Sequence, residues 1–253
     1  KVDKASLPQE ALLDLLTEDL ITKNKLQAID EQIGDTSGWQ GLTRDSSGRI
    51  VEIDWTLGNH RGSLNFEWIP STVKRFHIFC NQIIGTIDFT LFPADLEDVR
   101  MGSNRFSGEI GFEHLPKNLR YMSASYNDFE GTLHLRALPC TLRFLFLYMN
   151  RLSGSIDLTS LPEVMEILDV SGNVIHGSVD LTRLPPGMKV LNLSSNRLTG
   201  ETEFAYIPTS METLNISKNA GISGTVCISG DIFKNSVLST GTQITIRRVS
   251  NDD

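Results

Sequence analysis

The sequence predicts a solenoid of short stacked coils with parallel strands along one side. Three residue types recur at a step of 23 residues over most of the chain. The prolines are Pro70, Pro93, Pro116, Pro139, Pro162, Pro185 and Pro208, and the asparagines are Asn81, Asn104, Asn127, Asn150, Asn173, Asn196 and Asn219. Glycines keep this step from Gly62 to Gly200, and Gly224 follows 24 residues later. Self-similarity at a fixed period indicates a tandem array of structural repeats.

Each repeat contains one short strand. The eight repeats begin at Ile50, Val73, Leu96, Leu119, Leu142, Met165, Met188 and Met211, with apolar residues at positions one, four and six. Alternation at positions four and six indicates a strand, and so short a unit buries a core only by stacking in parallel with its neighbours. We therefore expect an N-terminal helical cap over 1–49, the array over 50–228 and a C-terminal cap over 229–253.

The first residues are expected to form an amphipathic helix that closes the open end of the first repeat. Residues 6–20 carry leucines at helical spacing, namely Leu12, Leu13, Leu16 and Leu20. Ser6 and Gln9 have the spacing of a capping box.

Further capping elements are expected at both ends of the array. A second short helix is predicted over 26–33, and Trp39 is expected to help close the first repeat. At the other end, residues 243–249 alternate like a strand that covers the last repeat.

The repeat consensus Leu-x-x-Leu-x-Leu-x-x-Asn-x-Leu-x-Gly-x-Ile resembles the leucine-rich repeat, and its second half is similar to the plant-type and protist subclass. The likeness covers residues 39–228. The stretch from Trp39 to Gly48-Arg49-Ile50 is similar to the N-terminal cap of that subclass, although Thr43 stands where a cap cysteine is expected. The resemblance implies a right-handed horseshoe with a concave parallel sheet, an irregular or 3₁₀ convex side and a short helical cap.

The three repeated columns are expected to serve the framework. A buried asparagine amide can satisfy backbone groups of the adjacent turn, which are costly to leave unpaired. Glycine permits tight turns or close approach of backbone, and proline fixes φ before the next strand.

The cysteines are expected to be free thiols. Cys80, Cys140 and Cys227 lie two or more repeats apart, so the nearest pair is separated by roughly 10 Å, too far for a disulfide. Free thiols favour a reducing compartment, and hence a cytoplasmic protein. A secreted or cell-surface location is the alternative, because the chain begins at Lys1 without a methionine and a targeting segment can have been removed.

Two glycosylation sequons begin at Asn192 and Asn215, on the solvent-facing fifth position of their strands. Short sequons arise often by chance, and with the free cysteines the unmodified form is expected.

Composition and motifs argue against several classes of function. The net charge of −8 opposes nucleic-acid binding, and no stretch reaches the roughly 18 apolar residues of a membrane span. The five histidines share no column, so no metal site or other cofactor is expected; they are His60, His77, His114, His134 and His176. There is no Cys-x-x-Cys, phosphate-binding glycine loop or nucleophile elbow, so the protein is expected to be non-catalytic.

The informative residues are those that the framework does not require. Positions two, three, five, seven and eight of each repeat should face solvent on the concave side, because strand side chains alternate. Aromatic residues, methionine and arginine are the types that dominate interface energetics, and aromatic residues and arginines gather in the second, fourth and fifth repeats. The predicted binding residues are His77, Phe79, Arg100, Arg120, Tyr121, Tyr126, Arg143, Phe144, Phe146, Tyr148 and Met149.

These residues predict a protein- or peptide-binding module centred on the fourth and fifth repeats. Arg100, Arg120 and Arg143 are expected to pair with carboxylates of the ligand. The aromatic patch could instead only shield the sheet, or lie buried in the homodimer of a self-associating scaffold. The subclass resemblance adds the ligand-sensing ectodomain of a cell-surface receptor. Binding of single-stranded nucleic acid is opposed by the charge.

Overall fold

The structure, a computed structural model, describes residues 3–30, 35–229, 237–238 and 240–249. The chain forms two compact units, residues 1–128 and 129–253. Each unit is a stack of coils whose strands pair with residues 23 positions further along the chain. The predicted solenoid with parallel strands is therefore confirmed.

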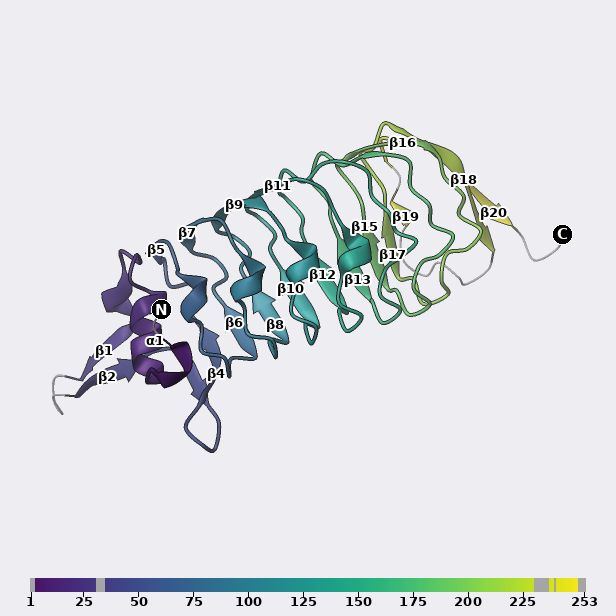
Figure 1. Cartoon of the computed structure of the whole chain (residues 1–253). Helices are drawn as coiled ribbons and strands as arrows, with labels where there is room; N and C mark the ends of the chain where they lie inside the picture. Colours follow the sequence, from purple (N-terminus) through teal and green to yellow (C-terminus); the bar gives the residue numbers. More distant parts are fainter. Residues whose placement is uncertain (1–2, 31–34, 230–236, 239, 250–253) are drawn as a thin grey trace. The chain divides into compact units, whose positions relative to one another are not determined.

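The first unit has a row of strands on one side of its coils (Figure 1). In chain order the strands are β3 (Leu42–Arg44), β4 (Ile50–Asp54), β6 (Arg75–His77), β8 (Asp98–Arg100) and β10 (Tyr121–Ser123). β4 to β10 pair in parallel, with Ile53 opposite Phe76, Phe76 opposite Val99 and Val99 opposite Met122. β3 pairs antiparallel with β4 and so covers the edge of the row.

The other side of the first unit carries a second row of short strands, which the sequence did not predict. These are β5 (Arg61–Gly62), β7 (Gln82–Gly85) and β9 (Arg105–Glu109), paired in parallel. The 3₁₀ turns follow them, as the resemblance implied: η3 (Phe66–Trp68), η4 (Phe89–Leu91) and η5 (Phe112–His114).

The N-terminal helix is shorter than predicted. α1 spans Gln9–Leu16, preceded by η1 (Lys4–Ser6) and followed by η2 (Lys23–Lys25). The capping box is wrong, because Pro8 is the N-cap residue without a side-chain hydrogen bond and the Ser6 hydroxyl donates to Asp3 O. Gln9 instead accepts a hydrogen bond from Ile50 N at 2.5 Å and ties α1 to β4. The apolar face is confirmed, since these leucines are buried: Leu12, Leu13, Leu16 and Leu20.

The second predicted helix is wrong over its described residues. β1 (Gln27–Asp30) pairs antiparallel with β2 (Asp35–Trp39), while residues 31–33 of the predicted helix lie outside the described residues. A single isolated helix of this length is marginal in water, whereas the strand finds backbone partners in β2. Trp39 stacks on the buried Trp55, with ring centroids 6.3 Å apart, as expected of a capping residue.

The second unit repeats the arrangement. Its first row is β12 (Phe144–Phe146), β13 (Ile167–Asp169), β15 (Val190–Asn192), β17 (Thr213–Asn215) and β19 (Val237–Leu238). All these neighbours pair in parallel, and β19 keeps the 23-residue step because Val237 lies opposite Leu214. The repeat register thus continues one strand beyond residue 228, where the sequence analysis ended the array.

The other side of the second unit also carries short strands. β11 (Asp128–Glu130) begins at the boundary of the two units and η6 (Leu135–Ala137) follows it. The row itself is β14 (His176–Gly177), β16 (Arg197–Glu201), β18 (Gly221–Ser229) and β20 (Gln243–Val249). β20 occupies the residues predicted for a terminal strand and pairs in parallel with β18.

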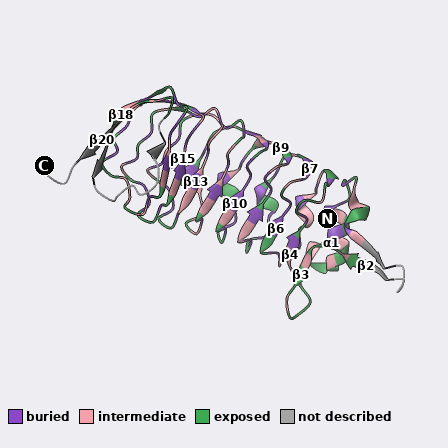
Figure 2. Cartoon of the chain, turned by 180° about the vertical axis from the view of Figure 1, so that it is seen from behind, coloured by how far each residue is buried: buried purple, intermediate pink, exposed green. Residues whose placement is uncertain are grey.

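The core lies between the two rows of each unit, as the buried residues in Figure 2 show. Positions one, four and six of the repeat are fully buried, for example Leu142, Leu145 and Leu147. The expected role of the asparagine column is confirmed. Asn104 accepts from Ile83 N and donates to Ile78 O and Met101 O, at 2.8–3.1 Å.

Candidate binding face and polar cluster

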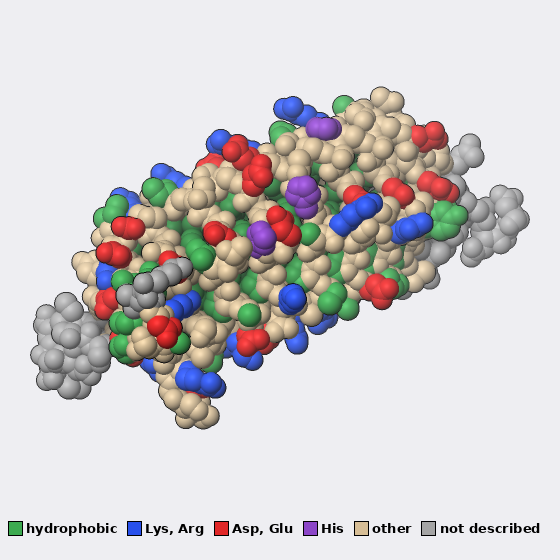
Figure 3. All heavy atoms as spheres, viewed as in Figure 1, with side chains coloured by type: hydrophobic (Ala, Val, Ile, Leu, Met, Phe, Trp, Pro, Cys, Tyr) green, Lys and Arg blue, Asp and Glu red, His purple; other side chains and the backbone are tan. Residues whose placement is uncertain are grey.

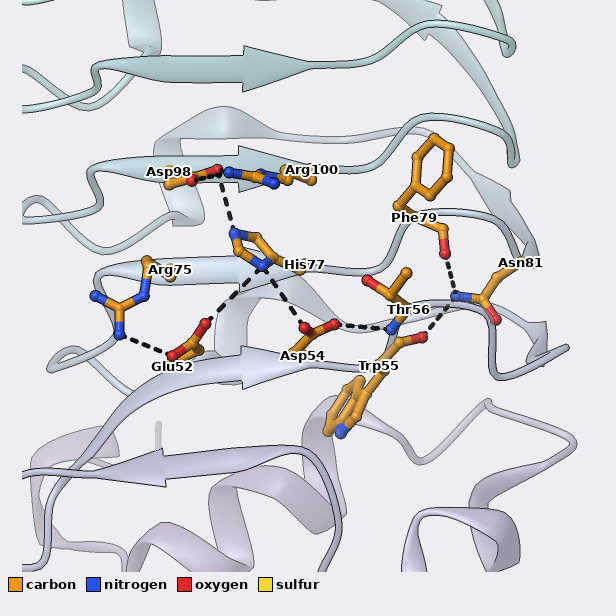
Figure 4. A network of polar contacts seen from close by, with 10 residues as sticks. All are labelled: Glu52, Asp54, Trp55, Thr56, Arg75, His77, Phe79, Asn81, Asp98 and Arg100. Carbon is orange, nitrogen blue, oxygen red and sulfur yellow. Dashed lines mark hydrogen bonds and ion pairs between the residues drawn. The ribbon is translucent and has the colours of Figure 1, made fainter.

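The strand row of the first unit displays most of its predicted site residues to solvent. Phe79 is 36% exposed and Tyr126 51% exposed, and Arg100 and Arg120 are also exposed. Tyr121 is half-buried. His77 differs from the prediction because it is buried, with only 8% of its surface exposed. Its ring faces the intended side of the strand, but side chains from the flanking strands cover it (Figure 4).

The strand row of the second unit displays the remaining predicted residues. Arg143 is exposed, Met149 is 49% exposed, and Phe144, Phe146 and Tyr148 are half-buried. Position four of the same strand, Leu145, is fully buried. The alternation of side chains therefore places Phe146 and Tyr148 outside the apolar stack, as the repeat register predicted.

The eighth position of the repeat has left-handed backbone, which pushes its side chain outward. In seven of the eight repeats this position is a non-glycine residue with φ between 52° and 58°, namely Leu57, Cys80, Ser103, Tyr126, Met149, Ser195 and Lys218. In the remaining repeat it is Gly172, with φ 64°. Leu57, Tyr126 and Met149 are among the most exposed large apolar side chains described. The strained turn after each strand is therefore also where the repeat presents apolar groups.

An arginine lies over an aromatic ring in each unit. In the first unit the Arg100 guanidinium is 4.5 Å from the Tyr121 ring centroid, and Asp98 holds it with bonds of 3.0 and 2.8 Å. The hydrogen bonds to Asp98 raise the pKa of Arg100. In the second unit Arg143 lies 5.3 Å from the Phe144 ring centroid and pairs with Glu166. Both cations are thus already neutralised by acidic neighbours.

Arg120 has a different environment. It is exposed on the strand row of the first unit, and among the described residues its guanidinium forms no ion pair. Of the three arginines expected to meet a ligand carboxylate, Arg120 can do so without leaving an internal partner.

The first unit also contains a polar cluster that the sequence analysis missed (Figure 4). Register brings its members together: Asp54 lies opposite His77 and His77 opposite Arg100, while Glu52 lies opposite Arg75. Asp98, opposite Arg75 on β8, completes the set. Acidic and basic groups alternate along Glu52, Arg75 and Asp98, whereas Asp54 is followed by His77 and Arg100.

The distances within this cluster are short. Arg75 Nη2 is 2.7 Å from Glu52 Oε2, and His77 Nε2 is 3.2 Å from Asp98 Oδ1. His77 Nδ1 lies 4.0 Å from Glu52 Oε1 and 3.9 Å from Asp54 Oδ2. Two histidines at the same repeat position would have indicated such a site, but this cluster contains only one histidine. Comparing the fifth positions of adjacent repeats, Asp54 and His77, would have found it.

Hydrogen bonds and ion pairs hold the acidic groups of the cluster in their charged forms. The Arg75 hydrogen bond is the main cause that lowers the pKa of Glu52. Burial alone would raise the pKa of Asp98, but its contacts with His77 and Arg100 outweigh burial and lower it. The pKa of Asp54 is lowered in the same way, against burial, chiefly by hydrogen bonds from Thr56.

The polar strands of the second unit form a ladder along positions five and seven. Ser171 donates to Asp169, Ser194 to Asn192 and Ser217 to Asn215, at 2.6–2.8 Å. The Asn192 amide also donates to Asp169 Oδ2 at 2.9 Å. The side-chain amide of Asn192 therefore links two neighbouring strands of this row.

Cys80 and Cys140 carry free thiols, and the side chain of Cys227 lies outside the described residues. Acidic and basic side chains are interspersed on the face drawn in Figure 3. Among the described residues no helix is long and apolar enough to cross a membrane.

Neither a family model nor a curated protein matches the chain, but solved structures do. Pollen Receptor Kinase 3 matches with a TM-score of 0.60 and 21% identity, over 78% of this chain and 98% of that one. A second match is the LRR ectodomain of the receptor kinase GASSHO1/SCHENGEN3 from Arabidopsis thaliana, solved in complex with CASPARIAN STRIP INTEGRITY FACTOR 2. Its TM-score is 0.55 and its sequence identity 20%, over 87% of this chain and 33% of that one. A plant ice-binding protein matches with a TM-score of 0.55 and 17% identity, over 97% of this chain and 98% of that one.

The chain thus spans about one third of the GASSHO1/SCHENGEN3 ectodomain. At these identities the likeness shows the fold and does not transfer a function, since one fold serves several functions.

Proposed function

We propose that this chain, a leucine-rich-repeat solenoid, is a non-catalytic module that binds a protein or peptide through the solvent-facing side of its strand rows. The observation that carries the proposal is the set of half-exposed aromatic side chains beside Arg143, namely Phe144, Phe146 and Tyr148. Large amphipathic side chains on a rigid sheet provide contact area with little loss of conformational entropy. The receptor ectodomain in the comparisons was solved in complex with another factor, which supports a binding role for this chain.

The first unit contributes a charged contact to this proposal. Arg120 is the arginine of the strand row that can receive a ligand carboxylate, while Arg100 is held by Asp98. A partner with an acidic side chain or a free C-terminus suits this arrangement, because an arginine fork binds a carboxylate with two hydrogen bonds.

The aromatic contact is tested in the second unit. The wild-type chain is first used to capture partners from the native cell, and these partners are identified. The Kd of the complex between the chain and each identified partner is then measured. The double variant Phe146→Ala/Tyr148→Ala should weaken binding by about 2 kcal/mol or more, roughly 30-fold. Tyr206→Ala is the matched control, because Tyr206 is 59% exposed but lies off the strand row. Equal Kd values for all three proteins would rule out this face.

The charged contact is tested separately with Arg120→Ala. This change should weaken binding of the same partner by about 1–2 kcal/mol, as expected for loss of one charge-assisted contact. Arg105→Ala is the control, since Arg105 is also exposed in the first unit but belongs to β9 on the other row. If both substitutions reduce affinity equally, a general charge effect and not a contact at Arg120 is responsible.

A self-associating scaffold is the alternative that the same aromatic residues allow. Light scattering over a dilution series distinguishes the two functions. A binding module with a free strand face stays at the 28.1 kDa of one chain, whereas a scaffold gives a larger mass that falls on dilution.

The ectodomain of a cell-surface receptor is the second candidate function. The ectodomain among the structural matches favours a secreted or cell-surface location over the cytoplasmic one. Protease treatment of intact cells that express the tagged native protein tests this: an exposed chain is digested, and a protected chain rejects the candidate.

A further inference from the structure

His77 in the first unit is a buried histidine whose two ring nitrogens both face carboxylates. It is 8% exposed, and among the described residues Nε2 forms no hydrogen bond, although Asp98 Oδ1 lies 3.2 Å away. Nδ1 lies beyond hydrogen-bond distance of its nearest described acceptors, Glu52 and Asp54, at 4.0 and 3.9 Å. Buried polar groups without partners are rare and costly, so this ring calls for an explanation.

The geometry around Nδ1 indicates a cation. An unprotonated Nδ1 would point its lone pair at two carboxylate oxygens, which is repulsive. A proton on Nδ1 would draw one carboxylate to about 2.7–2.9 Å, the usual length of such a charged hydrogen bond. Instead both oxygens stay almost equally distant from the nitrogen, at 4.0 and 3.9 Å.

We propose that Glu52, Asp54 and His77 bind a divalent transition-metal ion of the zinc class. One donor atom from each residue lies within 4.8 Å of the other two. A tetrahedral ion at about 2.0–2.2 Å would bring the donors to roughly 3.4 Å from one another, so the most distant pair needs to close by at most about 1.4 Å. A mixed nitrogen and oxygen donor set suits zinc better than magnesium or calcium, which prefer oxygen alone.

Neighbouring side chains and backbone groups orient the three donor residues. Arg75 contacts Glu52 Oε2 and Thr56 N contacts Asp54 Oδ1, so that the other oxygen of each carboxylate lies nearest His77. Asp98 lies 3.2 Å from Nε2 and would accept its proton after a small rotation of the ring, as carboxylates next to metal-binding histidines do. Three carboxylates outnumber the two guanidinium groups of the cluster, which favours a cation (Figure 4).

The bound ion would keep one coordination position without a protein ligand. Three protein ligands leave a fourth position of a tetrahedral ion for water or another ligand. Asp54 is exposed, so this position faces solvent on the strand row. This site stands independently of the proposed partner binding, since it uses none of the aromatic residues of the second unit.

Zinc titration of the whole metal-free chain by calorimetry tests the proposal. We expect one saturable site, and cobalt(II) in its place should give the intense visible absorption of a tetrahedral ion. His77→Gln and Asp54→Asn should each weaken zinc binding at least tenfold. Asp54→Asn keeps the oxygen that accepts from Thr56 and changes an exposed residue, so it tests the site even if His77→Gln folds poorly.

His114→Gln is the matched control, because His114 is an exposed histidine of the same unit outside the cluster. It should bind zinc as the wild type does. Absence of a saturable site, or equal zinc binding by all four proteins, would overturn the proposal and leave His77 as a member of an ion-pair network only.

Discussion

Asp157 shows how much of the acidic surface is engaged in local contacts. Its carboxylate accepts from Thr159 Oγ1 at 2.6 Å, from Thr159 N at 2.9 Å and from Arg136 Nε at 2.5 Å. These bonds, with the Thr159 hydroxyl first, lower its pKa to about 2. Asp88 and Asp180 make the same contacts with a threonine two residues on, and their pKa values are lowered as well.

The pH dependence of stability follows from this residue. A carboxyl whose pKa is lower in the folded state stabilises the fold above its unfolded pKa, and this contribution disappears as the pH falls through the folded value. For Asp157 the loss should occur between about pH 4 and pH 2. Asp157→Asn should therefore cost about 0.5–1 kcal/mol at pH 7, the range of a solvent-screened pair, and less at pH 2.

Urea unfolding at both pH values measures this difference. Glu163→Gln is the control, since Glu163 is exposed in the same unit and its replacement should leave the free energy of unfolding unchanged. A cost for Asp157→Asn that is the same at pH 7 and pH 2 would contradict the assignment.

At the scale of one coil, the buried asparagine is the main polar support. Asn104 is 8% exposed and bonds to four backbone groups of its own and the preceding coil. Asn104→Ala would leave Ile83 N buried without this partner, whereas Ile78 O keeps its hydrogen bond from Asn81. A buried group left unpaired costs about 1–3 kcal/mol, so the free energy of unfolding should fall by about that amount.

The matched control is Asn118→Ala in the same unit. Asn118 is exposed, and its amide donates only to Asp95, at 3.0 Å. Its replacement should change the free energy of unfolding by less than about 0.5 kcal/mol in the same chemical denaturation experiment. Similar losses for the two variants would show that the column is not specifically stabilising.

The junction between cap and first coil depends on Gly62. Its φ is +105°, and a Cβ there would lie 2.3 Å from Asp19 O. Gly62→Ala should lower the free energy of unfolding by about 2 kcal/mol or more, through backbone strain and this clash. Gly187→Ala, with no left-handed φ and no atom within 4 Å, should change it little. Comparable stability of the two variants by thermal unfolding would contradict this account.

The repeated columns explain which elements could be predicted from the sequence. The 23-residue step sets strand register, so the outward direction of Phe146 followed from its neighbours Leu145 and Leu147. The left-handed eighth position could not be predicted, because only Gly172 among eight residues signals it. The burial of His77 was missed because its covering groups, Glu52 and Asp98, belong to two other repeats.

At the scale of the whole molecule, both compact units have the same construction, although they differ in what they present to solvent. The first combines a polar cluster with Arg120, whereas the second has aromatic side chains on β12 and a ladder of serines and asparagines on its later strands. The framework is shared by every coil, so differences in function must arise from these exposed positions.

The central claim is that partners dock on the strand row, and site-specific photo-crosslinking tests it most directly. A photoreactive phenylalanine analogue is placed at Phe146 on the strand row, and at Tyr206 away from it, in the protein expressed in its native cell. We predict that the probe at position 146 gives a discrete crosslinked partner and that the probe at position 206 does not. Crosslinks from position 206 alone, or the same products from both positions, would contradict the claim.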